Sequence, residues 1–508
     1  MKRSFVRLAA AVGGLAVWTA PLLAQGYQVR LDTWFQSVAY RGWQLDSVPF
    51  DSVSTGATGG YEFNGFAVNC GQGTTTECYY YTAGDEQQGA PLVSTLDAAL
   101  WGLGVRGLSF RLKARAGADL ADPDVWPAVK PEAQLLEAYG EYENRFLTVV
   151  LGRFHQVTRL GYIGVDGGEV DLRLFDRKLE LFGYGGWGLA PGAPLLVSSE
   201  WANPLDQFQP PQRQYVLGGG LGWRLSGFEG RWLYHREIDA SSDANYLFAE
   251  RTALDLAWYP KRGFSVTGGL EYDIGQDVIG TADVTLGYTT PKRNIRASLG
   301  ARRYRPNFPL WLIWNSFSPV GYTAGFGSIY WWPIGGLELR GLGEIFSYGD
   351  AEATERYGEV SDDGWRGQFG VTYSGIAQWR FDGNYWVENG TGSTQLGVDL
   401  RATWEAPIDD LVITAHGGYL TRPLEYRYND IQGWNGALRV DYMPMADVRF
   451  MGEARYYWED RRRPENDAAA FDWNQWRINL GLTLYFGSSP DTPTLHPSIL
   501  LIPEARSA

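Results

Sequence analysis

Residues 476–486 read WRINLGLTLYF, and every second side chain from Ile478 onward is apolar. Such alternation places neighbouring side chains on opposite faces of an extended strand. One face would hold Ile478, Leu480, Leu482, Leu484 and Phe486, and the other would hold Arg477, Asn479, Gly481, Thr483 and Tyr485. The stretch therefore predicts a strand with an apolar environment on one side and water on the other.

The same alternation recurs in GLSFRLKARAGAD (107–119), LELRGLGEIF (337–346), QLGVDLRATW (395–404) and VRFMGEARYYW (448–458). Soluble sandwiches also alternate, so the pattern alone does not identify the solvent on each face. These segments, however, are about 10 to 14 residues long, which suits tilted membrane-spanning strands. Their polar faces carry charges of both signs, and their apolar faces often end in Trp or Tyr, as a membrane barrel requires.

Connection lengths indicate how many strands the barrel has. Short turns are expected at 106–107, 143–145, 176–177, 226–227, 260–263, 291–294, 335–336, 374–376, 406–410 and 443–447. Longer loops are expected between them, including 42–93, 119–131, 187–211, 305–322, 349–364, 422–432 and 460–472. Ten short turns join twenty strands, and unpaired first and last strands near 27–40 and 473–486 raise the total to 22. We therefore predict an all-β fold, a single antiparallel barrel of about 22 strands with short periplasmic turns and long extracellular loops.

Composition agrees with one large β-domain. Gly (64), Tyr (30), Trp (22) and Phe (23) are plentiful, and only 20% of the residues are charged. No linker-like break interrupts residues 25–486, the predicted barrel domain. Residues 487–508 are predicted to form a periplasmic C-terminal tail.

Residues 1–24 have the three parts of a secretory signal: basic Lys2, Arg3 and Arg7, a short apolar stretch, and a small residue at Ala24. No later run is apolar and long enough for a membrane helix. Because removal of the signal would take away three basic residues from a chain of net charge -14, the mature chain is more acidic still, which argues against nucleic acid as a partner.

Two cysteines, Cys70 and Cys78, are the only ones in the chain. In an oxidising, exported setting they are expected to form a structural disulfide. The four histidines are scattered, and we expect no metal site and no cofactor.

The polar faces of the predicted strands supply the candidate pore lining. Its residues are Arg111, Lys113, Arg115, Glu229, Arg296, Glu338, Arg340, Glu344, Arg380, Asp382, Asp399, Arg401, Arg439, Arg449, Glu453, Arg455 and Arg477. Cross-strand pairing around a wet lumen is one interpretation, and a ladder that selects solutes by charge is the other. The run Arg111, Lys113, Arg115 would favour anions.

The chain resembles Gram-negative outer-membrane porins. The resemblance rests on the signal, the amphipathic strands, the terminal WRINLGLTLYF, and AYGEYENRFLTVVLGRFHQ (138–156), which is similar to a hairpin of large substrate-specific, alginate-export-like porins. It implies that Trp476, Tyr485 and Phe486 form the assembly signal read by the barrel-assembly machinery. It also implies an outer-membrane location among lipid and lipopolysaccharide. One departure is that residues 487–508 follow the terminal aromatic.

The sequence predicts a non-enzymatic channel for small polar or charged solutes. The two G-x-G-x-x-G matches (102–107 and 183–188) do not open a helix after a buried strand, and no hydrolase, nucleotide or haem-attachment motif is found. One alternative is the sheath of a porin-cytochrome electron conduit around a multihaem cytochrome. A second is an adhesion or structural protein. The lumen could be open, narrowed by loops 42–93 or 305–322, or filled by a partner, and the tail could dock a periplasmic partner.

Overall fold

The computed structural model describes residues 26–55, 61–64, 66–70, 76–121, 129–190, 193–199, 201–202, 213–239, 247–305, 321–349, 363–390, 393–408, 410–421, 431–461 and 473–487. The predicted signal, most of loop 305–322 and the tail beyond residue 487 lie outside these ranges. Within them, no helix has the length and apolar character needed to cross a membrane.

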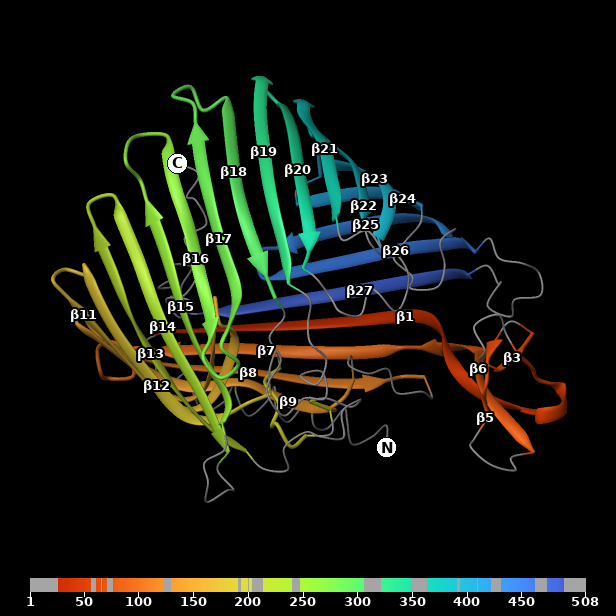
Figure 1. The fold of residues 1–508 in the computed structure, drawn as a ribbon. Coiled ribbons are helices and arrows are strands. Elements are labelled where there is room, and N and C mark those ends of the chain that lie inside the picture. Colours follow the sequence, from red (N-terminus) through yellow and green to blue (C-terminus); the bar gives the residue numbers. More distant parts are fainter. Residues whose placement is uncertain are drawn as a thin grey trace.

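The chain folds as one closed antiparallel barrel of 22 strands (Figure 1), which confirms the predicted fold class. The wall is formed by β1 (Gly26–Pro49), β7 (Pro91–Trp101), β8 (Leu108–Asp119), β9 (Ala133–Glu143), β10 (Leu147–Thr158), β11 (Gly161–Leu174), β12 (Leu179–Gly188), β13 (Gln214–Leu225), β14 (Phe228–Asp239), β15 (Leu247–Trp258), β16 (Phe264–Asp273), β17 (Val278–Thr289), β18 (Ile295–Tyr304), β19 (Tyr322–Ile334), β20 (Leu337–Tyr348), β21 (Asp363–Ile376), β22 (Trp379–Gly390), β23 (Ser393–Glu405), β24 (Leu411–Thr421), β25 (Ile431–Met445), β26 (Val448–Arg461) and β27 (Trp473–Gly487). Two further strands, β5 (Asn69–Cys70) and β6 (Glu77–Gly89), extend this sheet beyond the wall to a total of 24.

The C-terminal stretch WRINLGLTLYF (476–486) closes the barrel. It lies in β27 and pairs antiparallel with β1, with Val29 opposite Phe486 and Leu31 opposite Leu484. Each predicted short turn joins two neighbouring strands at one end of the barrel. Turn spacing and period-two alternation were therefore sufficient to predict the strand number.

At the barrel end opposite the short turns, the connections vary in length more than the sequence predicted. Residues 42–93 are not an open loop, because β1 continues to Pro49 and pairs with β6 along most of that length. The β10–β11, β16–β17 and β22–β23 connections at this end, residues 159–160, 274–277 and 391–392, are short. Alternation of short and long connections therefore holds for only part of the circumference.

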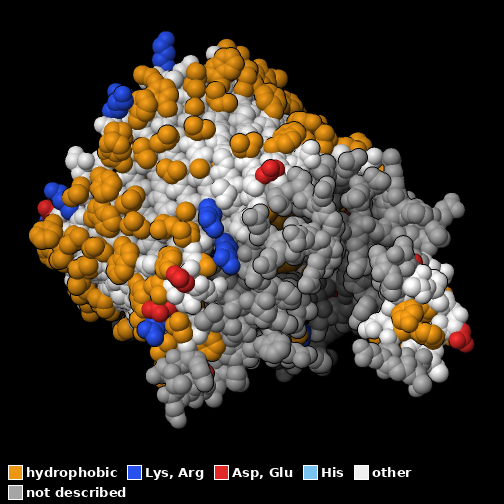
Figure 2. All heavy atoms as spheres, in the orientation of Figure 1, with side chains coloured by type: hydrophobic (Ala, Val, Ile, Leu, Met, Phe, Trp, Pro, Cys, Tyr) orange, Lys and Arg blue, Asp and Glu red, His pale blue; other side chains and the backbone are white. Residues whose placement is uncertain are grey.

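Apolar side chains cover the outside of the wall. Trp476, Ile478, Leu480 and Phe486 are 61%, 44%, 52% and 51% exposed, although they belong to a continuous sheet. Figure 2 shows hydrophobic side chains spread over the visible wall. Exposure of large apolar residues on one face of most wall strands is what a lipid-facing surface requires.

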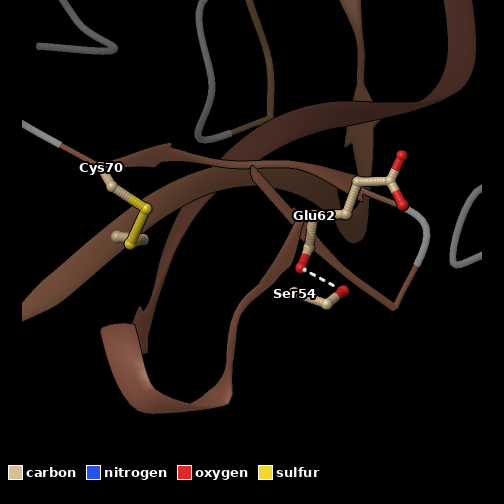
Figure 3. Close-up of a disulfide and its surroundings, with 4 residues drawn as sticks. Ser54, Glu62 and Cys70 are labelled. Carbon is tan, nitrogen blue, oxygen red and sulfur yellow. Dashed lines mark hydrogen bonds between the residues drawn. A yellow bond between two sulfur atoms is a disulfide. The ribbon is translucent and has the colours of Figure 1, made fainter. Parts of the chain in front are cut away.

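The extended β1–β6 hairpin carries a small stapled unit beyond the barrel end. Cys70 and Cys78 form a disulfide, and the three-stranded sheet of β2 (Ser54–Thr55), β3 (Tyr61–Phe63) and β4 (Phe66–Ala67) lies beside it, after the short 3-10 helix η1 (Phe50–Ser52) (Figure 3). Ser54 Oγ donates a hydrogen bond to the Glu62 carbonyl at 3.2 Å. The stapled unit has its own apolar cluster, formed by Val48, Val68 and the fully buried Cys78.

Replacement of both cysteines by serine is expected to loosen this unit without opening the barrel. Closure of a loop with a sequence separation of 8 contributes about 2 kcal/mol to local order in the chain-entropy description. The Cys70→Ser/Cys78→Ser variant should be cut faster by protease between residues 50 and 77. Its barrel should still resist heating in detergent as the wild type does. Equal proteolysis of both proteins would contradict the expectation.

Candidate functional site

The β10–β11 hairpin leaves the barrel wall. β10 pairs with β9 only as far as Arg153, opposite Ala138, and β11 pairs with β12 only from Val165 onward. The two strands nevertheless remain paired with each other up to Thr158 and Gly161. Residues 154–164 therefore form a tip, called here the hairpin tip, with no ladder to the neighbouring wall strands.

Arg159 shows where the hairpin tip goes. Its Nε lies 2.5 Å from Asp255 Oδ1 on β15, and its Nη1 lies 2.5 Å from Asp283 Oδ1 on β17. At a strand spacing of about 4.8 Å, β15 is roughly 20 Å along the wall from β11, and β17 is farther. A turn residue of β10–β11 can reach both carboxylates only if the tip folds into the lumen.

Glycines permit the bend where the tip leaves the wall. Gly152 has φ +133°, which a residue with a side chain rarely adopts, and a Cβ there would collide with the Ala138 carbonyl oxygen. Its register partner Gly167 lies against the backbone of Gly185 and Gly186, where a Cβ would also collide. Small residues on three adjacent strands thus allow the sheet to fold sharply inward.

One face of the hairpin tip packs on the inner wall. Phe154, Leu160 and Ile163 are 4%, 2% and 4% exposed and belong to one apolar cluster with Phe182 of β12 and Leu233 of β14. A fully buried Phe or Leu contributes roughly 1.5–3 kcal/mol. Three such side chains, with the Arg159 ion pairs, hold the tip firmly against β12–β17.

The other face of the hairpin tip turns toward β8 and β9. His155 Nδ1 lies 3.4 Å from Glu137 Oε1, and the His155 ring stacks on Tyr162 at 5.2 Å. Glu137 is also 3.2 Å from Arg111 Nε. These contacts lie at the base of the tip, next to the last β9–β10 pair, and from there the tip extends inside the barrel along β12–β17 and narrows the lumen.

A row of charged side chains extends along the inner wall from Arg159. Asp283 is the register partner of Arg302 on β18, and Arg302 Nη2 is 2.5 Å from Glu344 Oε2. Arg366 Nη2 is 2.7 Å from Glu344 Oε1. We call this row the ion ladder; its members are Asp255, Arg159, Asp283, Arg302, Glu344 and Arg366.

The ion ladder borders a cavity of about 1580 Å³ inside the barrel. Its lining includes Arg159, Arg231 and Arg302, together with aromatic residues such as Tyr322. The Tyr322 ring lies 5.6 Å from the Arg302 guanidinium and 5.8 Å from that of Arg366. Arg366 also donates a hydrogen bond to the Tyr322 hydroxyl at 2.5 Å, so ring and guanidinium groups form one connected cluster at the cavity wall.

The structure places most predicted pore-lining residues in short-range pairs. The contacts join Arg111 to Asp97 and Glu137, Glu229 to Arg224, Arg340 to Glu338, Arg380 to Asp382, His416 to Asp399, Arg439 and Arg449 to Asp441, and Arg455 to Glu453. Arg477 lies over the Tyr457 ring, Arg401 is opposite Asp382 in register, and Arg296 is exposed at the short-turn end of β18. Five of these nine contacts join neighbouring strands, and four join residues two positions apart on the same strand, so charges pair both across and along the strands.

The basic run on β8 faces carboxylates. Arg111 is ion-paired with Asp97 and Glu137, and Lys113 is the register partner of the same two residues. Arg115 lies one row farther along, opposite Thr95 and Gln134. The charge of the run is thus partly compensated.

The predicted assembly-signal residues divide between the two faces of β27. Trp476 and Phe486 are exposed on the outer face, and Trp476 packs against Tyr456 at 4.9 Å. Tyr485 faces inward, with the Arg30 guanidinium 5.6 Å from its ring.

Sequence reasoning did not select Arg159, Asp283 or Arg366. Asp283 and Arg366 follow the period-two pattern and could have been included on that basis. Arg159 lies in a turn, where alternation gives no direction. The sequence signal that could have revealed the inward fold is the set of glycines in GVDGG (164–168) and Leu151-Gly152-Arg153. Glycines inside a strand often mark a bend or a close approach of two backbones.

Among the residues that the structure describes, no group of acidic, His or Cys side chains is arranged to hold a metal ion. No family model and no curated protein matches the chain. Solved structures share its general outline: OccK8 (OprE) of Pseudomonas aeruginosa (8% identity, 92% of this chain and 99% of that chain, TM-score 0.40), a BenF-like porin of Pseudomonas fluorescens Pf-5 (10%, 91% and 100%, 0.41) and the siderophore receptor PirA of Pseudomonas aeruginosa (10%, 90% and 80%, 0.46). These identities and scores assign the chain to no family.

Proposed function

We propose that this protein is a non-enzymatic outer-membrane channel for small polar or charged solutes, narrowed by its own hairpin tip. The single observation that carries the proposal is a charge-lined lumen into which an ordered hairpin folds, with a cavity of about 1580 Å³ beside it. Closed barrels with an apolar outside and a polar inside are found in outer membranes.

The hairpin tip favours a solute channel over the electron conduit. A cytochrome sheath needs an interior free enough to hold a folded protein, whereas here the β10–β11 hairpin occupies the space between β9 and β15–β17. Paired charges on the wall also differ from the apolar core of an obligate protein interface. Water and small solutes suit such a surface better.

Conductance of the purified protein in a planar bilayer tests the proposal. We expect steady single-channel currents from the protein alone. In Arg111→Ala/Lys113→Ala/Arg115→Ala, the reversal potential under a salt gradient should shift toward cation preference, because Asp97 and Glu137 lose their partners. The charge-preserving variant Arg111→Lys/Arg115→Lys is the control and should keep the wild-type value. An intact barrel that carries no current would refute the proposal.

A further inference from the structure

Basic residues are concentrated in the short turns of one part of the barrel. The six turns between β7 and β18 hold eight basic residues and one acidic residue, Asp176; the basic residues are Arg106, Arg145, Arg177, Lys178, Lys261, Arg262, Lys292 and Arg293. The four turns between β19 and β26 hold no basic residue and three acidic ones, Asp409, Asp410 and Asp447. This division is unexpected in a chain of net charge -14.

The eight residues form one continuous surface, called here the basic arc. Strands β7 to β18 are neighbours in the barrel, so their turns follow one another along the rim. Figure 2 shows Lys and Arg side chains at the upper-left edge, where Figure 1 places the turns from β11–β12 to β17–β18. Twelve strands at about 4.8 Å spacing give an arc of roughly 50 Å, much longer than a single small solute.

Most charges of the basic arc are available for a partner. All eight basic residues are exposed. Among the described residues, Arg145 is the one member of the arc with an ion pair, to Asp176 at 2.5 Å, and both of these side chains are more than 70% exposed. An ion pair this exposed contributes little and exchanges readily for another anion.

Apolar residues alternate with the charges of the basic arc. Val105, Phe146, Phe175 and Tyr259 are 50%, 60%, 74% and 45% exposed in the same turns, next to Arg106, Arg145, Arg177 and Lys261. Lys261 Nζ also lies 4.5 Å from the centre of the Phe264 ring. Exposed aromatic and basic side chains together are typical of the membrane interface, where rings enter the headgroup region and ammonium or guanidinium groups meet phosphates.

We propose that the basic arc binds anionic phospholipid headgroups of the leaflet that faces the periplasm, and so gathers such lipids along one side of the barrel. The inference uses the membrane location and the periplasmic placement of the short turns. Lipid fits better than a soluble acidic protein, because a protein surface would leave the interleaved apolar side chains without a hydrocarbon environment. Each basic residue near an anionic membrane surface strengthens association about fivefold.

Lipid retention tests the proposal. The full-length protein is reconstituted with equimolar phosphatidylglycerol and phosphatidylethanolamine, extracted in mild detergent, and the lipids retained per barrel are quantified. Wild-type protein should retain phosphatidylglycerol in several-fold excess, and high salt should abolish the excess. Lys261→Gln/Arg262→Gln/Lys292→Gln/Arg293→Gln should lose most of it. Asp410→Asn/Asp447→Asn, on the opposite part of the rim, is the control and should retain the wild-type excess.

Retention of both lipids in equal amounts by the wild type would overturn the proposal and leave an acidic soluble protein as the alternative occupant. An excess unchanged in the four-residue variant would also overturn it. Conductance measured in bilayers of phosphatidylethanolamine alone distinguishes failure of the lipid proposal from failure of the proposed channel function. The four-residue variant should conduct there like the wild type, whereas failure of the channel proposal would silence both proteins.

Discussion

Replacement of residues 155–164 by an Asn-Gly turn is expected to raise the single-channel conductance several-fold. The change removes the part of the hairpin tip that crosses the lumen, including Arg159, and leaves the wall strands complete. Phe154 and Val165 remain as register partners and flank the new turn, as Thr158 and Gly161 flank the native one. Conductance rises because the ion path beside β12–β17 is no longer blocked.

The matched control shortens another connection at the same end. Residues 274–277, between β16 and β17, are replaced by the same Asn-Gly turn. This variant should keep the wild-type conductance, because the ion pairs that hold the hairpin tip join Arg159 to Asp255 and Asp283 and involve no residue of 274–277. Unchanged conductance after loss of residues 155–164 would mean that the hairpin tip is not the constriction. Resistance of both variants to unfolding in detergent would verify that the barrels are closed.

Arg159→Ala is expected to shift ion selectivity toward cations, with the permeability ratio of anion to cation falling roughly twofold or more. The guanidinium lies 2.5 Å from both Asp255 and Asp283 and offsets one of their two negative charges. Its loss leaves two carboxylates facing the cavity and removes a strong contact that holds the hairpin tip. Reversal potentials under a salt gradient give the ratio, and fluctuation of the open-channel current reports motion of the tip.

A combined variant separates charge from attachment. In Arg159→Ala/Asp255→Asn/Asp283→Asn, these three positions carry no net charge, against −2 in the single variant and −1 in the wild type, but the tip remains detached. The permeability ratio of anion to cation should rise to the wild-type value or above it, while current fluctuations should stay high. If the single and combined variants have the same selectivity, the two carboxylates do not face the ion path. If neither variant shows increased fluctuation, the apolar cluster of Phe154, Leu160 and Ile163 is sufficient to hold the tip.

Period-two alternation decides this fold locally. Within each strand the order of apolar and polar residues predicts which face contacts lipid and which contacts water, because successive side chains of a strand point to opposite faces. Glycine and charged turn residues such as Gly227, Gly263 and Asp447 then mark where each strand ends. The order of the strands followed because neighbouring antiparallel strands joined by short turns must pair.

The pairing of β1 with β6 beyond the barrel end could not be predicted from the local sequence pattern. Residues 44–49 and 77–89 lack a long apolar face, so the sequence favoured a loop. They pair because β1 is already fixed in the barrel by β7 and β27, and an adjacent segment can then continue its ladder at little entropic cost. The short strands β3 and β5 depend on that hairpin in turn.

The amino-acid sequence by itself determined the β-barrel, its strand number and its terminal strand WRINLGLTLYF, because these depend on local alternation and on pairing between strands joined by short turns. Only the tertiary structure decided that residues 154–164 fold inward, that Arg159 joins Asp255 and Asp283, and that eight basic turn residues form one arc. These features unite residues far apart in the chain, and such contacts depend on the curvature of the closed sheet rather than on local alternation.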